Sequence, residues 1–551
     1  MTLDTMSTIT AEAGKDAMNA TRHEKALGEL RLCDPETDNI ILIPTPTNDP
    51  NDPLNWPKPY RVYIAVLVSF AIFFSNFLAA GPTVAILNIT TDFLGSASSD
   101  LNSNVAKAAY FFTTTALLQG VSNLMWLPLI VKFGRRPVYV ASFTLYTAVV
   151  AWAGGATSFS SELGARIMMG VASGAAECLA PLTISDLFFV HERGNIMAIY
   201  TTALSAGVGC GIVIAGLITK DLHWRYIYWI SLILIGSCTI LIIFTFPETR
   251  FDRTEGAGDA RTITEHERII SPNCKSEGTY SDSARQSCFS VSPKRTYRQS
   301  LALFSGIHTQ ESYIKLVIRP IILLTLPPVL CATLTMAVTV GFLVAITSNF
   351  AVAFDAVYQF EPWQSGLCFI ASPVGAGVGA FFGGRFSDIV ADWLTRRNDG
   401  IRCPEMRLPA VSISLLTAPL ALTLYGVGID KGWHWIVPTI GLGLLSFSIV
   451  QSTNISLVYT IDSYRPIAGE LAVTQHAFKS VFGFLLSFYT NPWIAKSGYT
   501  NAFGAMAGIS GCVILMWIPM YIWGGRIRQV TWGWSFIRRL AHWHKDREVG
   551  E

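Results

Sequence analysis

Hydrophobic residues run along this chain in long blocks that are separated by short polar loops. Twelve blocks are long enough to cross a bilayer as helices, which requires about 20 mostly apolar residues each. An even number of spans would put both ends of the chain on one side of the membrane. The pattern therefore predicts an all-α polytopic membrane protein, with spans near residues 61–83, 108–131, 138–157, 163–189, 196–219, 224–246, 318–350, 364–388, 408–428, 435–460, 467–493 and 502–523.

The polar segments divide these spans into two groups of six. Residues 247–317 are rich in Ser, Thr, Arg and Glu and lack an apolar period, which predicts a mostly disordered linker. We expect a mostly disordered tail over 1–60, six-helix halves over 61–246 and 318–523, and a second tail over 524–551. In that tail Trp532, Phe536, Leu540 and Trp543 stand at helical spacing beside basic residues, which favours an amphipathic interfacial helix over a solvated tail.

Composition agrees with the membrane assignment. Hydrophobic residues make up 51% of the 551 positions and charged residues 14%, whereas a soluble domain has about 25% charged residues. A net charge of +2 gives no overall basic field, so a nucleic-acid partner is not expected. Several of the ten cysteines fall inside apolar blocks, which argues against a secreted disulfide framework. The first twenty residues lack the apolar core of a signal peptide, so the first span is expected to direct insertion.

The distribution of Lys and Arg in the short loops predicts orientation. One side carries ten of these residues and the other side five, so the positive-inside rule places both termini in the cytosol. On this topology the sequon at Asn88 faces outside and is a candidate glycosylation site, although it lies close to the first span. The sequon at Asn454 falls within a span and is expected to stay unmodified.

The two halves share a basic loop after their second span. The first reads "LPLIVKFGRR" over 127–136, and the second reads "GGRFSDIVADWLTRR" over 383–397. Two equivalent halves around a central cavity are common in secondary transporters, in which one half rocks against the other to give alternating access.

Four motifs carry a family resemblance. They are "DPNDPLNWPKPYR" at 49–61, "KFGRRP" at 132–137, "RIMMGVASGAAE" at 166–177 and "FPETR" at 246–250. With them the chain resembles the major facilitator superfamily, and within it the fungal twelve-spanning drug:proton antiporters. The resemblance implies two six-helix halves, a role of Arg166 in proton coupling, and conformational gating by Gly134, Arg135, Arg136, Gly384, Arg385 and Asp388.

The chain departs from the family pattern at three places. Leu127 and Val131 occupy positions where the family loop has Gly and Asp, whereas the second half keeps Gly384 and Asp388. We therefore expect an asymmetric ion-pair latch that Asp388 carries alone. The antiporter signature of the fifth span also lacks its proline, which weakens the antiport assignment relative to other transport modes.

The fourth span carries two ionisable residues, each of which costs about 2.5 to 3.5 kcal/mol to insert at mid-membrane. Arg166 and Glu177 are eleven positions apart, which puts them within about 20° of one helix face and about 16 Å apart along the axis. An apolar pocket favours the protonated form of a carboxylate, so Glu177 is a candidate for proton coupling. Alternatively, both charges brace helices by bonding to polar groups. Asp186 lies on the opposite face and is expected to fix a loop.

Further polar residues inside spans are candidates for a substrate cavity. Lys479 could complement an anionic substrate or pair with a carboxylate, and His476 shares its helix face. The amides could bind a ligand or, more often, join neighbouring helices. The predicted cavity set is Asn76, Gln119, Asn123, Gln451, Asn454, Gln475, His476 and Lys479.

Glycines at four-residue spacing allow close helix packing. Gly375, Gly379 and Gly383 have this spacing on the eighth span, and Gly207 and Gly211 have it on the fifth. The resemblance implies that these two helices meet between the halves, where smooth faces would let the halves slide. Ordinary tight packing is the alternative.

These observations predict a monomeric, proton-coupled secondary transporter that exports a small organic compound such as a drug, toxin or secondary metabolite. Uptake of a polar or cationic nutrient by proton symport is the nearest alternative, and a non-transporting sensor is a third. An enzyme is disfavoured because HExxH, GxSxG, phosphate-loop and metal-spacing motifs are missing, and no cofactor is expected. We expect the plasma membrane, with the vacuolar membrane as the alternative.

Overall fold

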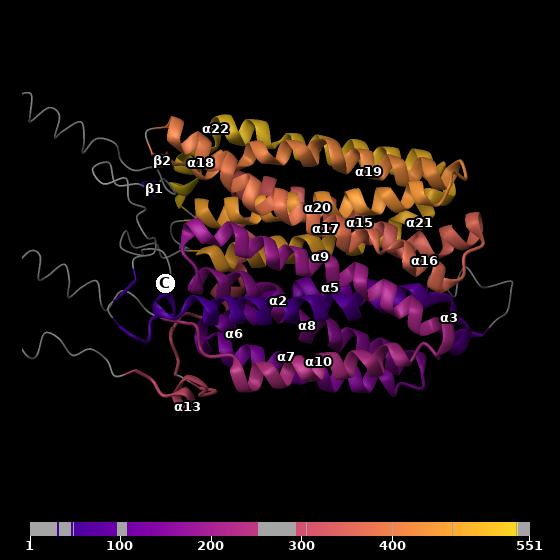
Figure 1. Cartoon of the computed structure of the whole chain (residues 1–551), viewed down its shortest axis with the longest axis horizontal. Helices are drawn as coiled ribbons and strands as arrows, with labels where there is room; N and C mark the ends of the chain where they lie inside the picture. The colour runs from indigo at the N-terminus through magenta and orange to yellow at the C-terminus, as the bar shows by residue number, and fades with distance from the viewer. Residues whose placement is uncertain are drawn as a thin grey trace, which may run out of the picture.

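The computed structural model describes residues 30–31, 46–47, 49–95, 107–251, 294–304, 306–398, 400–464, 467–535 and 537. Long helices lie side by side, with the first half, drawn indigo to magenta, next to the second half, drawn orange to yellow (Figure 1). The one pair of strands in the described part is short: β1 (Leu30–Arg31) pairs antiparallel with β2 (Ile401–Arg402).

The helices of the first half follow the predicted spans, with some breaks. α2 continues through the short helix η2 into α3, and the second span is divided at Ser122 into α5 and α6. The six spans are formed by α2 (Lys58–Ala80) with η2 (Gly81–Ala85) and α3 (Ile86–Leu94), α5 (Tyr110–Val121) with α6 (Asn123–Phe133), α7 (Arg135–Gly154), α8 (Phe159–Leu187), α9 (Val190–Asp221) and α10 (Tyr226–Thr245).

The second half repeats this arrangement. A π-helical turn, η3 (Phe382–Phe386), joins two segments of the eighth span, and η4 (Pro404–Val411) leads into the ninth. The helices are α15 (Pro327–Tyr358), α16 (Pro362–Cys368), α17 (Ala371–Phe381), α18 (Ser387–Arg397), α19 (Ser412–Asp430), α20 (Ile436–Ser463), α21 (Ala468–Leu515) and α22 (Trp517–Trp532).

Eleven candidate spans are long and apolar enough to cross a membrane within the described residues, and the last one holds two spans. Helix α21 has a break at Gly498, where φ is 79° and ψ is 164°. Glycine accepts this positive φ without strain, so the chain reverses direction there. The chain thus has the predicted twelve-helix, all-α architecture of a multi-pass membrane protein.

The structure corrects the start of the seventh span. We predicted one helix over 318–350, but α14 (Tyr313–Leu323) ends before Pro327, where α15 begins. Arg319 of α14 pairs with Glu311 at 2.8 Å and with Glu470 of α21 at 3.1 Å. Buried charges need such partners, so α14 is held against the end of α21 as a separate helix.

Part of the predicted disordered linker packs on the first half. The short helix α13 (Tyr297–Ser300) follows residue 294, and the Tyr297 hydroxyl donates to the Phe244 carbonyl at 2.5 Å. The backbone N–H of His308 donates to the Lys132 carbonyl at 3.0 Å. Residues 252–293 lie outside the described residues, as do residues 538–551 of the predicted interfacial tail helix.

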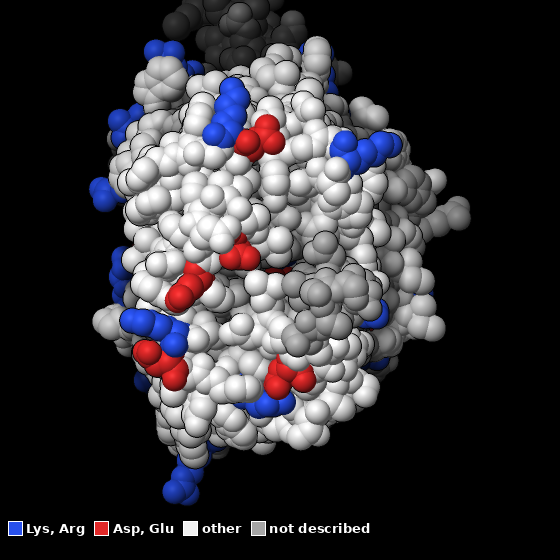
Figure 2. All heavy atoms as spheres, turned by 90° about the vertical axis from the view of Figure 1, so that its right-hand side faces the viewer, with Lys and Arg blue, Asp and Glu red and all other residues white. Residues whose placement is uncertain are grey.

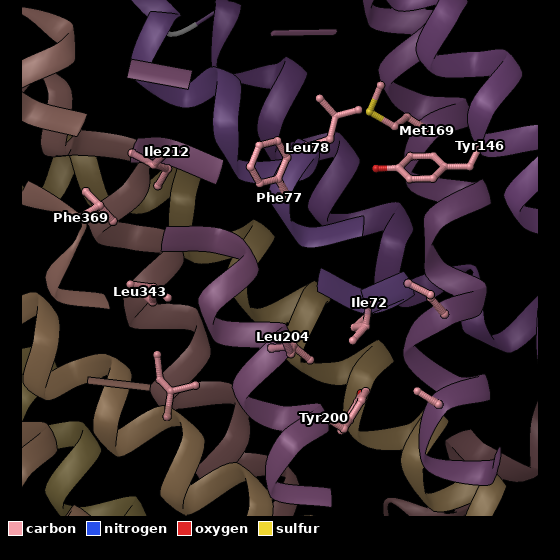
Figure 3. Close-up of a cluster of buried hydrophobic side chains, with 14 of the residues drawn as sticks. Ile72, Phe77, Leu78, Tyr146, Met169, Tyr200, Leu204, Ile212, Leu343 and Phe369 are labelled. Atoms are coloured by element: carbon pink, nitrogen blue, oxygen red, sulfur yellow. The ribbon is translucent and has the colours of Figure 1, made fainter. Parts of the chain in front are cut away.

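The largest buried apolar cluster crosses the boundary between the halves. Figure 3 shows part of it, with Leu204 and Ile212 of the first half in the same cluster as Leu343 and Phe369 of the second. Each of these four side chains is at most 5% exposed. The two halves therefore share one apolar core where these side chains meet.

The glycine rows pack inside each half, which corrects the expectation that they face across the boundary. A Cβ on Gly211 would lie 2.2 Å from the Phe77 carbonyl oxygen of α2, and a Cβ on Gly375 2.0 Å from the Gly443 carbonyl oxygen of α20. Gly207, Gly379 and Gly383 likewise face α2 or α20. Other glycines meet the opposite half, namely Gly209, Gly216, Gly366 and Gly384.

Two alanine substitutions on α17 test this packing. Gly375→Ala should lower the thermal unfolding temperature, because a Cβ there would overlap the Gly443 carbonyl. Gly377→Ala, on the same helix, meets nothing within 4 Å and should leave that temperature unchanged or raise it, because alanine favours a helix by about 1 kcal/mol over glycine. Equal effects of the two variants in a thermal-shift assay would contradict close α17–α20 packing.

Candidate functional site: a central cavity between the halves

A cavity lies between the halves. Its empty volume is about 1190 Å³, which includes the part that is open to solvent. Its walls extend toward the end of the molecule opposite the termini, through Thr83, Ile86 and Val352. Figure 2 views that end, whose middle is hollowed. Most of the lining is apolar, and the polar lining residues are Asn76, Thr83, Thr113, Gln119, Glu177, Ser205, Thr347, Ser348, Lys479 and Ser480.

An ion pair in the cavity wall joins the two halves. The Lys479 ammonium on α21 donates to Glu177 Oε1 on α8 at 2.9 Å. Glu177 is 2% exposed and Lys479 5% exposed. Breaking a pair buried this deeply by removing one partner costs about 3–5 kcal/mol, because it leaves an uncompensated charge. The pair is therefore a strong tie between α8 and α21.

Small residues bring these helices close enough to pair. A Cβ on Gly120 of α5 would lie 2.2 Å from Ser480 Oγ of α21. A Cβ on Gly174 of α8 would lie 2.3 Å from the Gln119 carbonyl oxygen of α5. Helix α5 thus contacts α8 on one side and α21 on the other, so it sets the separation across which Glu177 and Lys479 meet.

His476 and Tyr200 extend the ion pair into a network. Lys479 Nζ lies 3.1 Å from His476 Nδ1, which lies 3.5 Å from Glu177 Oε2. On its other side His476 Nε2 lies 3.2 Å from the Tyr200 hydroxyl of α9. That hydroxyl also lies 3.2 Å from the Glu177 carbonyl oxygen. Both His476 contacts with Glu177 and Tyr200 cross between the halves.

Two amides contact the same carboxylate from the first half. Gln119 Nε2 lies 3.4 Å from Glu177 Oε1, and Asn123 Nδ2 lies 3.4 Å from Oε2. Gln119 also approaches Asn76 Oδ1 at 3.5 Å. The carboxylate thus has the Lys479 ammonium and two amide groups as hydrogen-bond donors around it.

Arg166 does not pair with Glu177 but with Glu162, which stands one helical turn earlier on α8. Its Nε donates to Glu162 Oε1 at 3.3 Å, four residues earlier, and both side chains are at most 1% exposed. The Tyr228 hydroxyl donates to the same Glu162 oxygen, and the guanidinium lies over the Tyr228 and Phe112 rings at 5.0 and 5.2 Å. Arg166 is not among the cavity-lining residues.

Three of the eight predicted cavity residues line the cavity: Asn76, Gln119 and Lys479. The other five lie behind the wall, which corrects that prediction, because their polar groups bond to neighbouring helices. Gln451 donates to the Ala410 carbonyl at 3.0 Å, and Asn454 to the Gly383 carbonyl at 2.7 Å. Gln475 donates to Thr460 Oγ1 at 2.8 Å. Asn123 and His476 contact Glu177, as described above.

At the end that carries the termini, charged residues of the second half approach the first. Asp388 pairs with Arg407 at 2.6 Å and with Arg402 at 3.5 Å. The Asp388 carboxylate also lies against Gly194 of α9, where a Cβ would be 2.7 Å away. Of the other predicted gating residues there, Gly384 contacts Ala198 and Arg385 is exposed.

The basic loop of the first half has carboxylate partners as well, although Val131 stands where the family loop has Asp. Arg135 pairs with Asp186 at 2.9 Å. Glu248 of the "FPETR" segment accepts backbone N–H groups of Arg135 and Arg136 at 2.9 and 3.1 Å, at the N-terminus of α7, where a negative charge is favourable. Gly134, with φ of 96°, leaves room for that carboxylate.

Comparison with known proteins agrees with this architecture. The family model of the Major Facilitator Superfamily matches residues 63–471, and the chain belongs to that family. An MFS-type transporter of Schizosaccharomyces pombe is 27% identical, covering 90% of this chain and 89% of that protein. Protein HOL1 of Saccharomyces cerevisiae is 25% identical, covering 90% and 92%.

Solved structures show the same fold. The human organic anion transporter MFSD10 (TETRAN) superposes with a TM-score of 0.58 at 15% identity, covering 84% of this chain and 100% of that chain. The proton:xylose symporter XylE superposes with a TM-score of 0.55 at 14% identity, covering 85% and 96%. The protein is therefore a multi-pass membrane protein with the major facilitator fold, and its relatives are transporters.

Several residues of the site escaped the sequence analysis. Glu162 could have been found, because it stands four positions before Arg166 on the same helix face. Tyr200 and Arg407 carry no comparable signal, because their partners are 276 and 19 positions away along the chain.

The Arg166–Glu162 pair predicts a specific pattern of stability. Arg166→Leu should lower the thermal unfolding temperature strongly, because Glu162 would keep a buried charge without its partner; such losses reach about 3–5 kcal/mol. The double variant Glu162→Leu/Arg166→Leu should recover part of the loss. Lys58→Ala, which breaks the exposed pair with Glu192, is the control and should change little. If the double variant were less stable than Arg166→Leu, the unpaired charge of Glu162 would not be the cause of the loss in the single variant.

Proposed function

We propose that the protein is a proton-coupled secondary transporter that exports a small organic compound by alternating access. The observation that carries this proposal is the buried ion pair between Glu177 and Lys479, which joins the two halves at 2.9 Å in the cavity wall. A group that can bind a proton thus forms part of the tie that must break when the halves move.

Protonation of Glu177 would weaken that tie. The neutral carboxyl group no longer balances the Lys479 ammonium, which then keeps its contact with His476 Nδ1 at 3.1 Å. Because an unbalanced buried charge is costly, movement of α21 away from α8, or entry of water, would lower the free energy of the protein. Loss of the proton would restore the pair, so proton binding and the position of the halves are linked.

The hydrogen-bond directions support a role of His476 in this step. An ammonium group only donates, so the Lys479 contact makes His476 Nδ1 an acceptor and leaves the hydrogen on Nε2. Nε2–H can then donate to the Tyr200 oxygen, whose hydroxyl donates to the Glu177 carbonyl. In this tautomer the single lone pair of Nδ1 accepts from Lys479, so His476 connects the ammonium group to Tyr200 of the other half.

The mostly apolar lining supports an organic substrate. A compound that binds to such an apolar wall is itself mostly apolar, so it can enter the cell through the bilayer. A carrier that binds the compound from the cytosolic side can then export it against its concentration gradient. On this scheme protons enter from outside as the compound leaves, with the termini in the cytosol. The gating network around Asp388 and Arg407 would close the cytosolic side in the conformation described above.

Glu177→Gln tests the coupling. In proteoliposomes with an imposed pH gradient, this variant should lose the gradient-driven flux of an exported compound, because glutamine cannot exchange a proton. Its substrate exchange without a gradient should persist. Glu192→Gln, a carboxylate change at the partly exposed pair with Lys58, should keep gradient-driven flux. If Glu177→Gln kept that flux, proton coupling through this residue would be ruled out; wild-type substrate moving in the same direction as protons would indicate symport instead.

Tyr200→Phe tests the contact between His476 and α9. Loss of the hydroxyl removes this hydrogen bond across the two halves, so gradient-driven flux should fall about fivefold if the bond contributes about 1 kcal/mol to the transport step. Tyr146→Phe, whose hydroxyl approaches the Phe74 carbonyl at 3.4 Å within the first half, should leave the flux unchanged. Equal flux in Tyr200→Phe and the unmodified protein would mean that Tyr200 only packs there.

A further inference from the structure

Two hydroxyl oxygens in the cavity wall are fully buried and have no hydrogen-bond partner among the described residues: Thr113 Oγ1 on α5 and Ser205 Oγ on α9. Thr113 is 7% exposed and Ser205 is 1% exposed. A buried hydroxyl without a partner costs about 1–3 kcal/mol. A ligand that reaches these groups with its own polar atoms would remove that cost.

Other hydroxyls in the same wall differ from these two. Thr83, Thr347 and Ser348 donate to carbonyl groups of their own helical segments at 2.6, 2.9 and 2.8 Å. Serine and threonine in helices commonly bond in this way. Thr113 and Ser205 keep their hydrogen-bonding capacity, and because they lie on different helices they present it on two sides of the cavity.

The charges of the lining restrict the ligand further. Glu177 and Lys479 are the ionisable residues among those that line the cavity, and they neutralise each other at 2.9 Å. A charged ligand would lose its hydration without meeting a free counter-charge, which is unfavourable in an apolar site. Apolar side chains such as Phe112, Leu343 and Phe484 cover much of the remaining wall.

We propose that the substrate is an uncharged, mostly apolar molecule with hydroxyl or carbonyl groups on two edges, and that Thr113 and Ser205 determine this specificity by hydrogen bonding to them. This proposal rests on the proposed function, since it takes the central cavity as the substrate site.

A steroid series on one skeleton provides matched probes: estradiol, which is uncharged with a hydroxyl at each end; its 3-sulfate, an anion; its 17-amino analogue, a cation; and the parent estratriene hydrocarbon, which has the same aromatic ring and no oxygen. Binding to the full-length protein in nanodiscs is measured by equilibrium dialysis. Estradiol should bind most tightly, with at least about tenfold lower affinity for the sulfate and the amine. Stronger binding of either charged probe, or no saturable binding of estradiol, would overturn the proposal.

The variants Thr113→Val and Ser205→Ala should each weaken estradiol binding about five- to tenfold, as expected for the loss of about 1 kcal/mol from one hydrogen bond. Neither variant should change the binding of the estratriene hydrocarbon. The matched controls Thr115→Val on α5 and Thr202→Val on α9 remove hydroxyls that lie outside the cavity lining and already have partners, so estradiol affinity should stay within about twofold. Equal losses in controls and test variants would overturn the assignment.

The binding experiment needs no proton gradient, so it can be separated from the proposed function. Estradiol binding that depends on Thr113 and Ser205, without any flux driven by a pH gradient, would support the substrate class and contradict proton-coupled transport. Gradient-driven flux of a charged compound that the two variants leave unchanged would contradict the substrate class and support the transport function.

Discussion

A buried charge needs an opposite charge nearby, and in this protein the two partners come from different halves of the chain. Glu177 and Lys479 are separated by 302 positions in the sequence and by 2.9 Å in space. Each charge compensates the other, because leaving one buried charge without its partner costs several kcal/mol. The close contacts of α5 with α8 and α21 follow the same requirement, since the pair forms only if Gly120 and Gly174 let these helices approach.

Other buried charged residues also have partners of opposite charge, but these partners belong to the same half of the chain. Arg166 with Glu162, and Arg135 with Asp186, pair within the first half, and Arg319 with Glu470 within the second. Such pairs hold helices of one half together, so they can stay intact when the halves move. The Glu177–Lys479 pair crosses the boundary, which is why we assign it, rather than Arg166, to the step in which the halves separate.

Prediction from the sequence was accurate where a property depends on local composition. Long apolar blocks had to become spanning helices, because a lipid environment leaves backbone groups no other partners. The approximate span positions and the division into two groups of six followed from this pattern. The predicted start of the seventh span was wrong because apolar residues of α14 adjoin those of α15 with a gap of three residues, and the boundary is marked mainly by Pro327 and Pro328. The pairing of Arg135 with Asp186 was not foreseen, because the two residues lie 51 positions apart along the chain.

The sequence by itself determined the class of fold and the presence of Glu177 and Lys479 inside spans, because inserting a charge is costly wherever the helix lies. The tertiary structure decided which polar residues face the cavity and which join helices. Gln451, Asn454 and Gln475 are as polar as Gln119, but their amides meet carbonyl or hydroxyl groups of adjacent helices, whereas Gln119 lines the open space. That difference depends on helix rotation and on the neighbours that packing supplies, and neither is encoded in the spacing along one helix.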